Sequence, residues 1–251
     1  MMADDGGSCP PDVVSYTTVI DRFFKEGDIE KSFILLCEML GRGISANVVT
    51  YNAIIGGLCK AQAMDRAEEV LQQMFDKGIV PNCTTHNSLI DGYCSLEKWK
   101  HAIRMFKEIS RHGPQPDVVT YSLLMDYLCK IGSCTEARKI FDSMVQNHKG
   151  SKPTVIAPNH HVFNILICAY TKRQMVDEAM LIFKKIRQQG LKPDVVSYDT
   201  VLDGFCKIGR VDDAMFLFNQ MMEEGLAPDI FVFSSLIHGL CTIGRWKKAE
   251  A

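Results

Sequence analysis

A short segment of apolar and aromatic residues recurs along the chain at a nearly constant interval, and this repetition constrains the fold more than any other feature. Its seven copies read VVSYT, VVTYN, CTTHN, VVTYS, HHVFN, VVSYD and IFVFS, and they begin at Val13, Val48, Cys83, Val118, His160, Val195 and Ile230. Successive copies are 35 residues apart, except that 42 residues separate Val118 from His160. A fixed period of this length predicts an array of similar structural repeats rather than a single globular domain.

Each repeat has the pattern of two helices followed by a turn. In the second repeat, the residues with the i, i+3, i+4, i+7 spacing of one helical face are Tyr51, Ile54, Ile55 and Leu58. A second apolar stripe begins at Ala67, and a glycine and a proline then end the repeat, as Gly78 and Pro81 do here. One hairpin cannot bury both stripes, so we expect neighbouring hairpins to stack into an all-α solenoid.

The net charge and the apolar pattern limit the classes of function. The formal net charge is −2, so any affinity for nucleic acid must come from a local stripe of lysine and arginine. No stretch approaches the roughly 18 continuous apolar residues of a membrane span. We therefore expect no membrane partner. We also expect no small-molecule substrate.

The ten cysteines do not form a metal-binding or disulfide pattern, because no CxxC pair occurs in the sequence. Five of them share one position of the repeat: Cys59, Cys94, Cys129, Cys206 and Cys241. A cysteine that recurs in this way is interpreted as a small core residue in a reducing environment. The sequence also lacks HxE, GxxxxGK[ST] and GxSxG motifs, so we predict no catalytic residue, no metal and no cofactor.

The opening VVTYNAIIGGLCK from Val48 and the ending GLKPD from Gly190 resemble the pentatricopeptide repeat family, and the period separates the chain from 34-residue tetratricopeptide repeats. The repeats look like the P type, and plant fertility-restorer proteins are the most similar subgroup. The resemblance implies a right-handed α-solenoid of about seven helix-turn-helix repeats.

The expected domain organisation follows the repeat. Residues 1–12 are expected to be a leader with the remnant of a preceding repeat, and the array occupies 13–251, with repeats at 13–47, 48–82, 83–117, 118–159, 160–194, 195–229 and an incomplete 230–251. The seven extra residues around Asn147–Pro158 are interpreted as a longer loop. Because both ends stop within a repeat, we expect a fragment or a shortened relative of a longer array.

The resemblance implies that each repeat holds one RNA base through its fifth and its last residue. The pairs are Thr17 with Asn47, Asn52 with Asn82, Asn87 with Asp117, Ser122 with Asn159, Asn164 with Asp194, and Asp199 with Asp229, and Ser234 opens the last repeat. The recognition pattern of the family then implies the RNA sequence 5′-A-Y-U-A-U-N-R-3′, with no base assigned to the pair Asp199 and Asp229.

Two further positions are candidate contacts to RNA. The second residue of each repeat is expected to pack between bases, the alternative being a core position: Val14, Val49, Thr84, Val119, His161, Val196 and Phe231. The thirteenth residue is a lysine in five repeats and is expected to contact phosphates, the alternative being a charged helix end: Lys25, Lys60, Lys130, Lys172 and Lys207.

The leading hypothesis is sequence-selective binding of single-stranded RNA in organellar RNA processing, RNA stability or fertility restoration, with a processing protein as a recruited partner. The alternatives are a protein-binding solenoid scaffold and a truncated array with little activity. A mitochondrial location is implied by the family alone, with the chloroplast or the cytoplasm as alternatives.

Overall fold

The computed structural model describes residues 10–112, 114–146, 156–242 and 244, and every regular element within them is an α-helix. The first helices of the repeats are α1 (Val13–Lys25), α3 (Val48–Lys60), α5 (Cys83–Ser95), α7 (Val118–Lys130), α9 (His160–Lys172), α11 (Val195–Lys207) and α13 (Ile230–Thr242). The second helices are α2 (Ile29–Gly41), α4 (Met64–Asp76), α6 (Trp99–His112), α8 (Cys134–Gln146), α10 (Val176–Gln188) and α12 (Val211–Glu223).

The prediction of an all-α helical-repeat solenoid is confirmed. Each first helix begins at the residue where a copy of the sequence repeat begins. The right-handed sense of the solenoid stays a prediction. Most of the leader (residues 1–9), most of the lengthened loop (147–155) and the end of the seventh repeat (245–251) lie outside the described residues.

The first helices begin where they do because the preceding residue caps them. The side chain of Asp194, for example, accepts a hydrogen bond from the backbone N–H of Ser197 at 2.8 Å, and Asn82 accepts one from Thr85 at 3.1 Å. Such caps satisfy an N–H group that has no partner within the helix. At the other end of the repeat, Gly78 has φ +68° and lets the N–H of Ile79 bond to the carbonyl of Met74, which closes α4.

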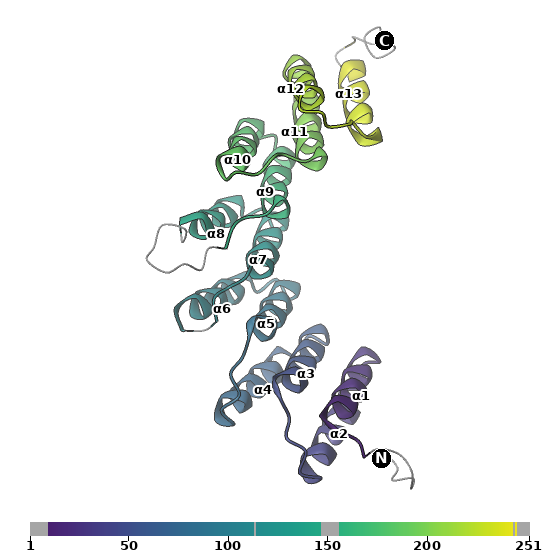
Figure 1. Ribbon diagram of the computed structural model, residues 1–251, viewed down its shortest axis with the longest axis vertical. Helices are drawn as coiled ribbons and strands as arrows, with labels where there is room; N and C mark the ends of the chain where they lie inside the picture. The colour runs from purple at the N-terminus through teal and green to yellow at the C-terminus, as the bar shows by residue number, and fades with distance from the viewer. Residues whose placement is uncertain (1–9, 113, 147–155, 243, 245–251) are drawn as a thin grey trace. The chain divides into compact units, whose positions relative to one another are not determined.

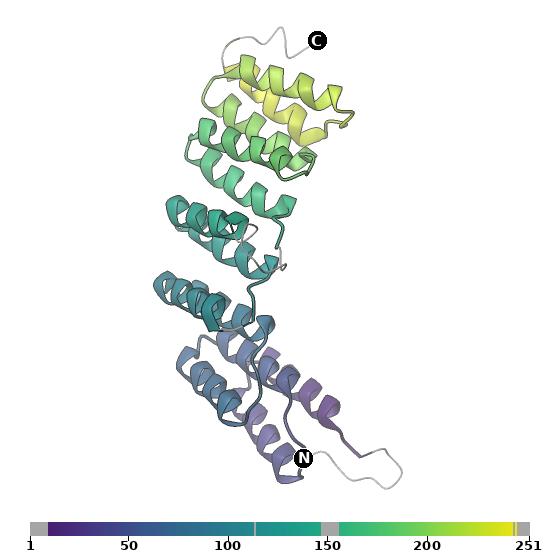
Figure 2. The same ribbon diagram turned by 60° about the vertical axis from the view of Figure 1, so that its left-hand side comes forward.

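The chain divides into two compact units, an N-terminal unit of residues 1–124 and a C-terminal unit of residues 125–251. In the N-terminal unit α3 lies between α1 and α5, and in the C-terminal unit α11 lies between α9 and α13 (Figure 1). The second helices α2, α4, α6, α10 and α12 each pack on the first helix of their own repeat and form a second layer (Figure 2). Each unit is therefore a row of first helices backed by second helices.

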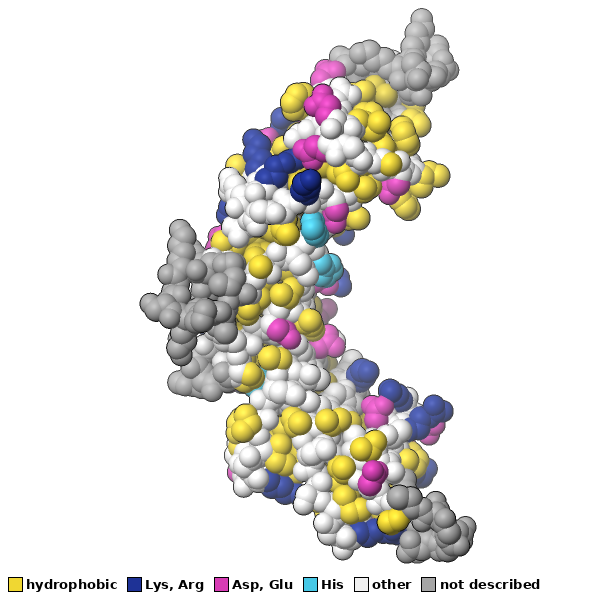
Figure 3. Space-filling model, viewed as in Figure 1, with side chains coloured by type: hydrophobic (Ala, Val, Ile, Leu, Met, Phe, Trp, Pro, Cys, Tyr) yellow, Lys and Arg dark blue, Asp and Glu magenta, His cyan; other side chains and the backbone are white. Residues whose placement is uncertain are grey.

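Aromatic pairs connect one repeat to the next inside each unit. The twenty-fourth residue of a repeat meets the fourth residue of the following repeat edge to face, with ring centroids 5.0–6.0 Å apart. These pairs are Phe106–Tyr121, Phe141–Phe163, Phe183–Tyr198 and Phe218–Phe233. Edge-to-face contacts of this kind stabilise the fold beyond what the burial of the rings alone contributes. Some hydrophobic side chains nevertheless reach the surface of each unit (Figure 3).

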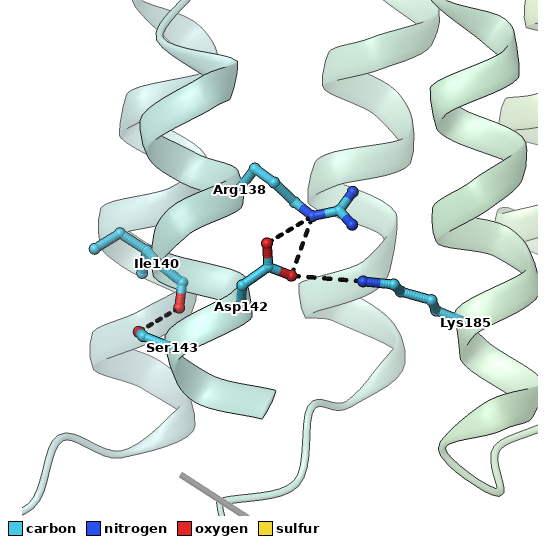
Figure 4. A network of polar contacts seen from close by, with 5 residues as sticks. All are labelled: Arg138, Ile140, Asp142, Ser143 and Lys185. Atoms are coloured by element: carbon cyan, nitrogen blue, oxygen red, sulfur yellow. Dashed lines mark hydrogen bonds and ion pairs between the residues drawn. The ribbon is translucent and has the colours of Figure 1, made fainter. Parts of the chain in front are cut away.

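Ion pairs connect neighbouring second helices. In the C-terminal unit, Asp142 of α8 accepts hydrogen bonds from Arg138 Nε to both of its oxygens, at 3.1 and 3.2 Å, and Lys185 of α10 lies 3.5 Å away (Figure 4). In the N-terminal unit, Arg66 of α4 pairs with Glu30 of α2 at 3.2 Å. The second layer is therefore held by charge pairs at its surface as well as by the core. Among the described helices, none is long and apolar enough to cross a membrane.

Candidate nucleic-acid interface

The fifth residues of the repeats lie on the first helices, at the edge of the core. Thr17 and Ser122 are each 9 % exposed, Ser234 is exposed, and the other four are half-buried. The three asparagines at this position each donate an Nδ2–H to the Oδ1 of the last residue of their own repeat. These bonds join Asn52 to Asn82 (3.1 Å), Asn87 to Asp117 (3.4 Å) and Asn164 to Asp194 (3.3 Å). The structure thus brings together three of the six predicted pairs by direct hydrogen bonds.

The first predicted pair is connected through a third residue. The hydroxyl of Thr17 is hydrogen-bonded to the hydroxyl of Thr50 at 2.8 Å, and Thr50 donates to the Oδ1 of Asn47 at 3.2 Å. Asn47 in turn caps α3. This pair is therefore adjacent in space but is not in direct contact through its own polar atoms.

The sixth pair differs from the others because both of its members are carboxylates. Asp229 caps α13 by accepting from the N–H groups of Phe231 and Val232 at 3.0 Å, whereas Asp199 accepts from the hydroxyl of Ser235 at 3.2 Å. No hydrogen bond joins Asp199 to Asp229 in this described part of the chain. The fourth pair, Ser122 and Asn159, has one member in each compact unit and stays a prediction.

A buried hydroxyl at the third position of the following repeat completes each asparagine site, and the sequence interpretation missed it. It donates to the Oδ1 of the fifth-position asparagine: Thr85 to Asn52 (2.5 Å), Thr120 to Asn87 (2.7 Å) and Ser197 to Asn164 (2.6 Å). These hydroxyl residues are at most 1 % exposed. The recurring Thr or Ser at the third place of CTTHN, VVTYS and VVSYD was the signal that would have revealed them.

Hydrogen bonds and burial shift the pKa values of the aspartates at this site. Burial raises the pKa of the Asp194 carboxyl, but hydrogen bonds from the hydroxyl and N–H of Ser197 and from Asn164 outweigh it, so this pKa lies below its ordinary value of 3.8. The pKa of Asp117 is lowered in the same way by Thr120 and Asn87. Asp199 shows the opposite shift, because burial and the nearby charges of Asp229 and Asp203 raise its pKa.

The second residues of the repeats are exposed rather than part of the core. All five apolar members are 57–67 % exposed: Val14, Val49, Val119, Val196 and Phe231. Thr84 and His161 are exposed as well. The alternative interpretation, that these residues are core positions, is wrong. Single exposed apolar residues are common on protein surfaces, but an exposed side chain at the same place in every repeat forms a regular series.

The lysines at the thirteenth position are all exposed, but three of them are paired with a carboxylate four residues earlier. These intrahelical ion pairs are Lys25–Asp21 (2.5 Å), Lys130–Asp126 (2.7 Å) and Lys207–Asp203 (2.5 Å). Lys60 and Lys172 have Gly56 and Cys168 at that place, and neither has an ion pair among the described residues. The series of lysines therefore offers free positive charge at two positions rather than five.

Several of the predicted residues meet in one cleft of the C-terminal unit. The cleft has a volume of about 560 Å³. His161, Asn164 and Lys172 line it from α9, and Asp126 and Lys130 line it from the end of α7. Residues of the second, fifth and thirteenth positions thus face a shared space, as a site that contacts base and phosphate together would require.

Three of the five recurring cysteines are buried, as a core position requires: Cys59, Cys94 and Cys206. Cys129 is half-buried and Cys241 is exposed, so the prediction of a core residue is wrong for Cys241. Burial raises the pKa of the Cys59 and Cys94 thiols to about 12. In the described ranges no group of three or more metal-ligating side chains comes together.

Comparison with known proteins identifies the repeat. The model of the PPR repeat family matches residues 11–60, 46–95, 84–130, 158–207 and 193–242, and a second PPR repeat model matches residues 119–148. A pentatricopeptide repeat-containing protein of Arabidopsis thaliana is 39 % identical over 46 residues, which is 18 % of this chain and 8 % of that protein.

Two solved structures are similar in fold. The maize pentatricopeptide repeat protein PPR10, in complex with an 18-nt psaJ RNA element, has a TM-score of 0.53 and 23 % identity, covering 96 % of this chain and 40 % of PPR10. Yeast Rmd9p, in complex with a 16-nt target RNA, has a TM-score of 0.56 and 17 % identity, covering 98 % of this chain and 51 % of Rmd9p. The chain therefore spans about half or less of these proteins.

Proposed function

Because this chain belongs to the pentatricopeptide repeat family, we propose that it binds single-stranded RNA sequence-selectively, with one base for each repeat. The observation that carries the proposal is the recurring hydrogen bond between the fifth and the last residue, in Asn52–Asn82, Asn87–Asp117 and Asn164–Asp194. The same polar pair returns at the same place in successive repeats, next to an exposed second residue. A one-base-per-repeat reader needs this arrangement.

The chemistry of recognition follows from the atoms that remain free. In Asn87, one Nδ2–H is used by Asp117 and the Oδ1 accepts from Thr120, which leaves the second Nδ2–H and one Oδ1 lone pair for the edge of a base. The exposed Val119 and its equivalents offer apolar contact to the faces of the bases. Lys60 and Lys172 carry the unpaired positive charge that would meet phosphates.

The proteins similar in fold support RNA as the ligand, since PPR10 and Rmd9p were each solved with an RNA bound. The order 5′-A-Y-U-A-U-N-R-3′ is part of the proposal. A role in RNA processing, RNA stability or fertility restoration in mitochondria, with a recruited processing protein, is a further part that depends on the family alone.

The test is a gel-shift titration at two salt concentrations, with RNA containing AYUAUNR, a scrambled RNA and the matching DNA. We expect tighter binding to the cognate RNA. The variant Asn87→Thr should move the preference at the third base from U to G by at least about five-fold, a typical effect of one hydrogen bond. The control Asn219→Thr changes an exposed asparagine on α12 and should leave the preference unchanged.

Absence of binding to any of these RNAs at micromolar concentrations, from a sample shown by circular dichroism to be helical, would refute the proposal. The protein-binding scaffold would then be the better account. An apolar cleft of about 530 Å³, lined by Leu71, Phe75, Val80, Met105 and Ile109 in the N-terminal unit, would be the place to look for a peptide.

A further inference from the structure

We infer that the buried hydroxyl at the third position of a repeat is a specificity-determining positioning residue, which holds the base-reading asparagine of the preceding repeat in one of its two amide orientations. The hydroxyls are those of Thr85, Thr120 and Ser197. This inference rests on the proposed function, since it concerns how the same site distinguishes bases.

An asparagine amide can present either its NH₂ or its oxygen to a ligand, because rotation by about 180° about the last side-chain bond exchanges the two. One orientation offers a donor and the other an acceptor, so the two would favour different bases. A side chain free to rotate would therefore discriminate poorly. Selective reading needs something in the protein that distinguishes the two ends of the amide.

The structure provides one contact for each end of the Asn87 amide. The carboxylate of Asp117 only accepts hydrogen bonds when ionised, and it takes the Nδ2–H of Asn87 at 3.4 Å. The hydroxyl of Thr120 has one proton and two acceptors within reach, the Oδ1 of Asn87 at 2.7 Å and the Oδ1 of Asp117 at 2.8 Å. Rotation of the amide would place oxygen against oxygen at Asp117. It would also put an NH₂ group where the Thr120 hydroxyl now finds the amide oxygen, so that this hydroxyl would keep only the carboxylate as an acceptor. The hydroxyl bond is the shorter of the two.

The direction of the hydroxyl is itself fixed. The Oγ1 of Thr120 accepts a hydrogen bond from the backbone N–H of Asp117 at 3.2 Å, and the Oγ1 of Thr85 accepts one from the N–H of Asn82 at 3.1 Å. With that lone pair used, the single hydroxyl proton points toward the carboxyl or amide oxygens beside it. Thr120 is 1 % exposed and Thr85 is 0 % exposed, so water does not compete for the proton.

The distribution of the hydroxyl within the chain agrees with this role. Each fifth-position asparagine, Asn52, Asn87 and Asn164, is followed by a third-position Thr or Ser in the next repeat. The two repeats that have a valine there, Val162 and Val232, follow a fifth residue that is not an asparagine. The hydroxyl is not confined to asparagine sites, since Thr50 follows Thr17 and is hydrogen-bonded to its hydroxyl at 2.8 Å, but every fifth-position asparagine has one.

The experiment compares Thr120→Val with Thr120→Ser, using RNAs that carry U, C, A or G at the third base of AYUAUNR. Valine keeps the shape and removes the hydroxyl, whereas serine keeps the hydroxyl that Ser197 provides in the sixth repeat. We expect Thr120→Val to lower the preference for U at the third base about five-fold, with selectivity at the fifth base unchanged. Thr120→Ser should stay within about two-fold of the parent.

Thr135→Val, at an exposed site on α8, is the matched control and should change neither preference. Ser197→Ala is a second variant, which should reduce selectivity at the fifth base only, and it replaces Thr120→Val if that protein does not fold. If the parent protein prefers U at the third base and Thr120→Val prefers it equally, the positioning role is wrong and the proposed function stands. If the parent protein prefers no RNA sequence, both are wrong.

Discussion

Phe24 of α1 fills the space in which a side chain on Gly57 of α3 would have to lie. A Cβ built on Gly57 would be 2.6 Å from the Cβ of Phe24, which is closer than such atoms approach in proteins. The tenth residue is a glycine at the same kind of contact in three other repeats. Added Cβ atoms would meet Cys59 from Gly92, Thr171 from Gly204 and Cys206 from Gly239. The close stacking of first helices therefore depends on a missing side chain.

Gly57→Ala is expected to destabilise the protein by about 1–3 kcal/mol, because Phe24 or the helix must shift to accept the methyl group. Gly56→Ala is the matched control. Its Cβ would meet only Ser88 Oγ, at 3.7 Å, and replacing a helical glycine by alanine should stabilise by about 0.5–1 kcal/mol. Urea unfolding followed by circular dichroism measures both. Equal effects of the two substitutions would contradict the packing argument.

A substitution in the turn between the two helices of a repeat is expected to raise the free energy of unfolding. Gln62 has φ +60°, although Gly27 and Gly209 occupy the same place in their repeats with φ +82° and +78°. A left-handed conformation costs a non-glycine residue about 1–2 kcal/mol, so Gln62→Gly should raise stability by about 1 kcal/mol. Gln73→Gly, in the exposed middle of α4, should lower stability by a similar amount. A loss of thermal stability in Gln62→Gly would contradict this expectation.

The raised pKa of Asp199 predicts a pH-dependent stability. Burial, with the charges of Asp229 and Asp203, makes the folded protein bind this proton more tightly than the unfolded chain, whose pKa is near 3.8. Ionisation of Asp199 therefore destabilises the fold as the pH rises through 3.8 to the raised folded pKa. Asp199→Asn should melt at a higher temperature than the parent at pH 7, and this difference should vanish at a pH below 3.8.

Asp194→Asn is the comparison for that experiment, because the pKa of Asp194 is lowered. Its ionised form stabilises the fold above pH 3.8, and this contribution is lost as the pH falls through the folded pKa. Asp194→Asn should therefore melt at a lower temperature than the parent at pH 7. If both variants shift the melting temperature in the same direction at pH 7, the assigned charge environments are wrong.

Some of the lysines are ion-paired and others are not, so removing an unpaired lysine and releasing a paired one should change RNA affinity in opposite directions. Lys172→Gln removes an unpaired charge in the cleft and should weaken binding, with the slope of log K against log salt falling by about 0.7 for one lost phosphate contact. Asp126→Asn frees Lys130 from its ion pair and should strengthen binding. Asp65→Asn, on the exposed start of α4, changes the net charge equally and is expected to have a small effect. Equal gains from Asp65→Asn and Asp126→Asn would mean that net charge alone matters.

The sequence was sufficient to predict the repeat and the start of each first helix, since a capping Asn or Asp precedes a regular apolar pattern, as at Asn47 and Asp194. It was not sufficient to predict that the second residues of the repeats are exposed. Periodicity cannot decide whether a valine such as Val49, in the first turn of a helix, faces the core or the solvent. The hydroxyl of Thr120 was missed because its partner Asn87 lies 33 residues earlier and is adjacent only after the repeats stack.

The lysine series shows what a prediction from one position of the repeat leaves out. The Asp126–Lys130 pair has the i, i+4 spacing that forms ion pairs on helices, so the sequence already contained the partner. Considering lysine alone at the thirteenth position predicted an equivalent phosphate contact in five repeats. The ninth position has to be included before the free charge of each repeat can be estimated.

The last residue of a repeat has two structural roles. Asn82, for example, caps α5 and also accepts the hydrogen bond that Asn52 donates. Only a few side chains, mainly Asn, Asp, Ser and Thr, cap a helix well, so most substitutions there cost about 0.5–2 kcal/mol of stability. The fifth residue does not cap a helix. New RNA sequences would therefore be recognised in evolution mainly through substitutions at the fifth position. The last position is restricted to the few residue types that cap a helix well.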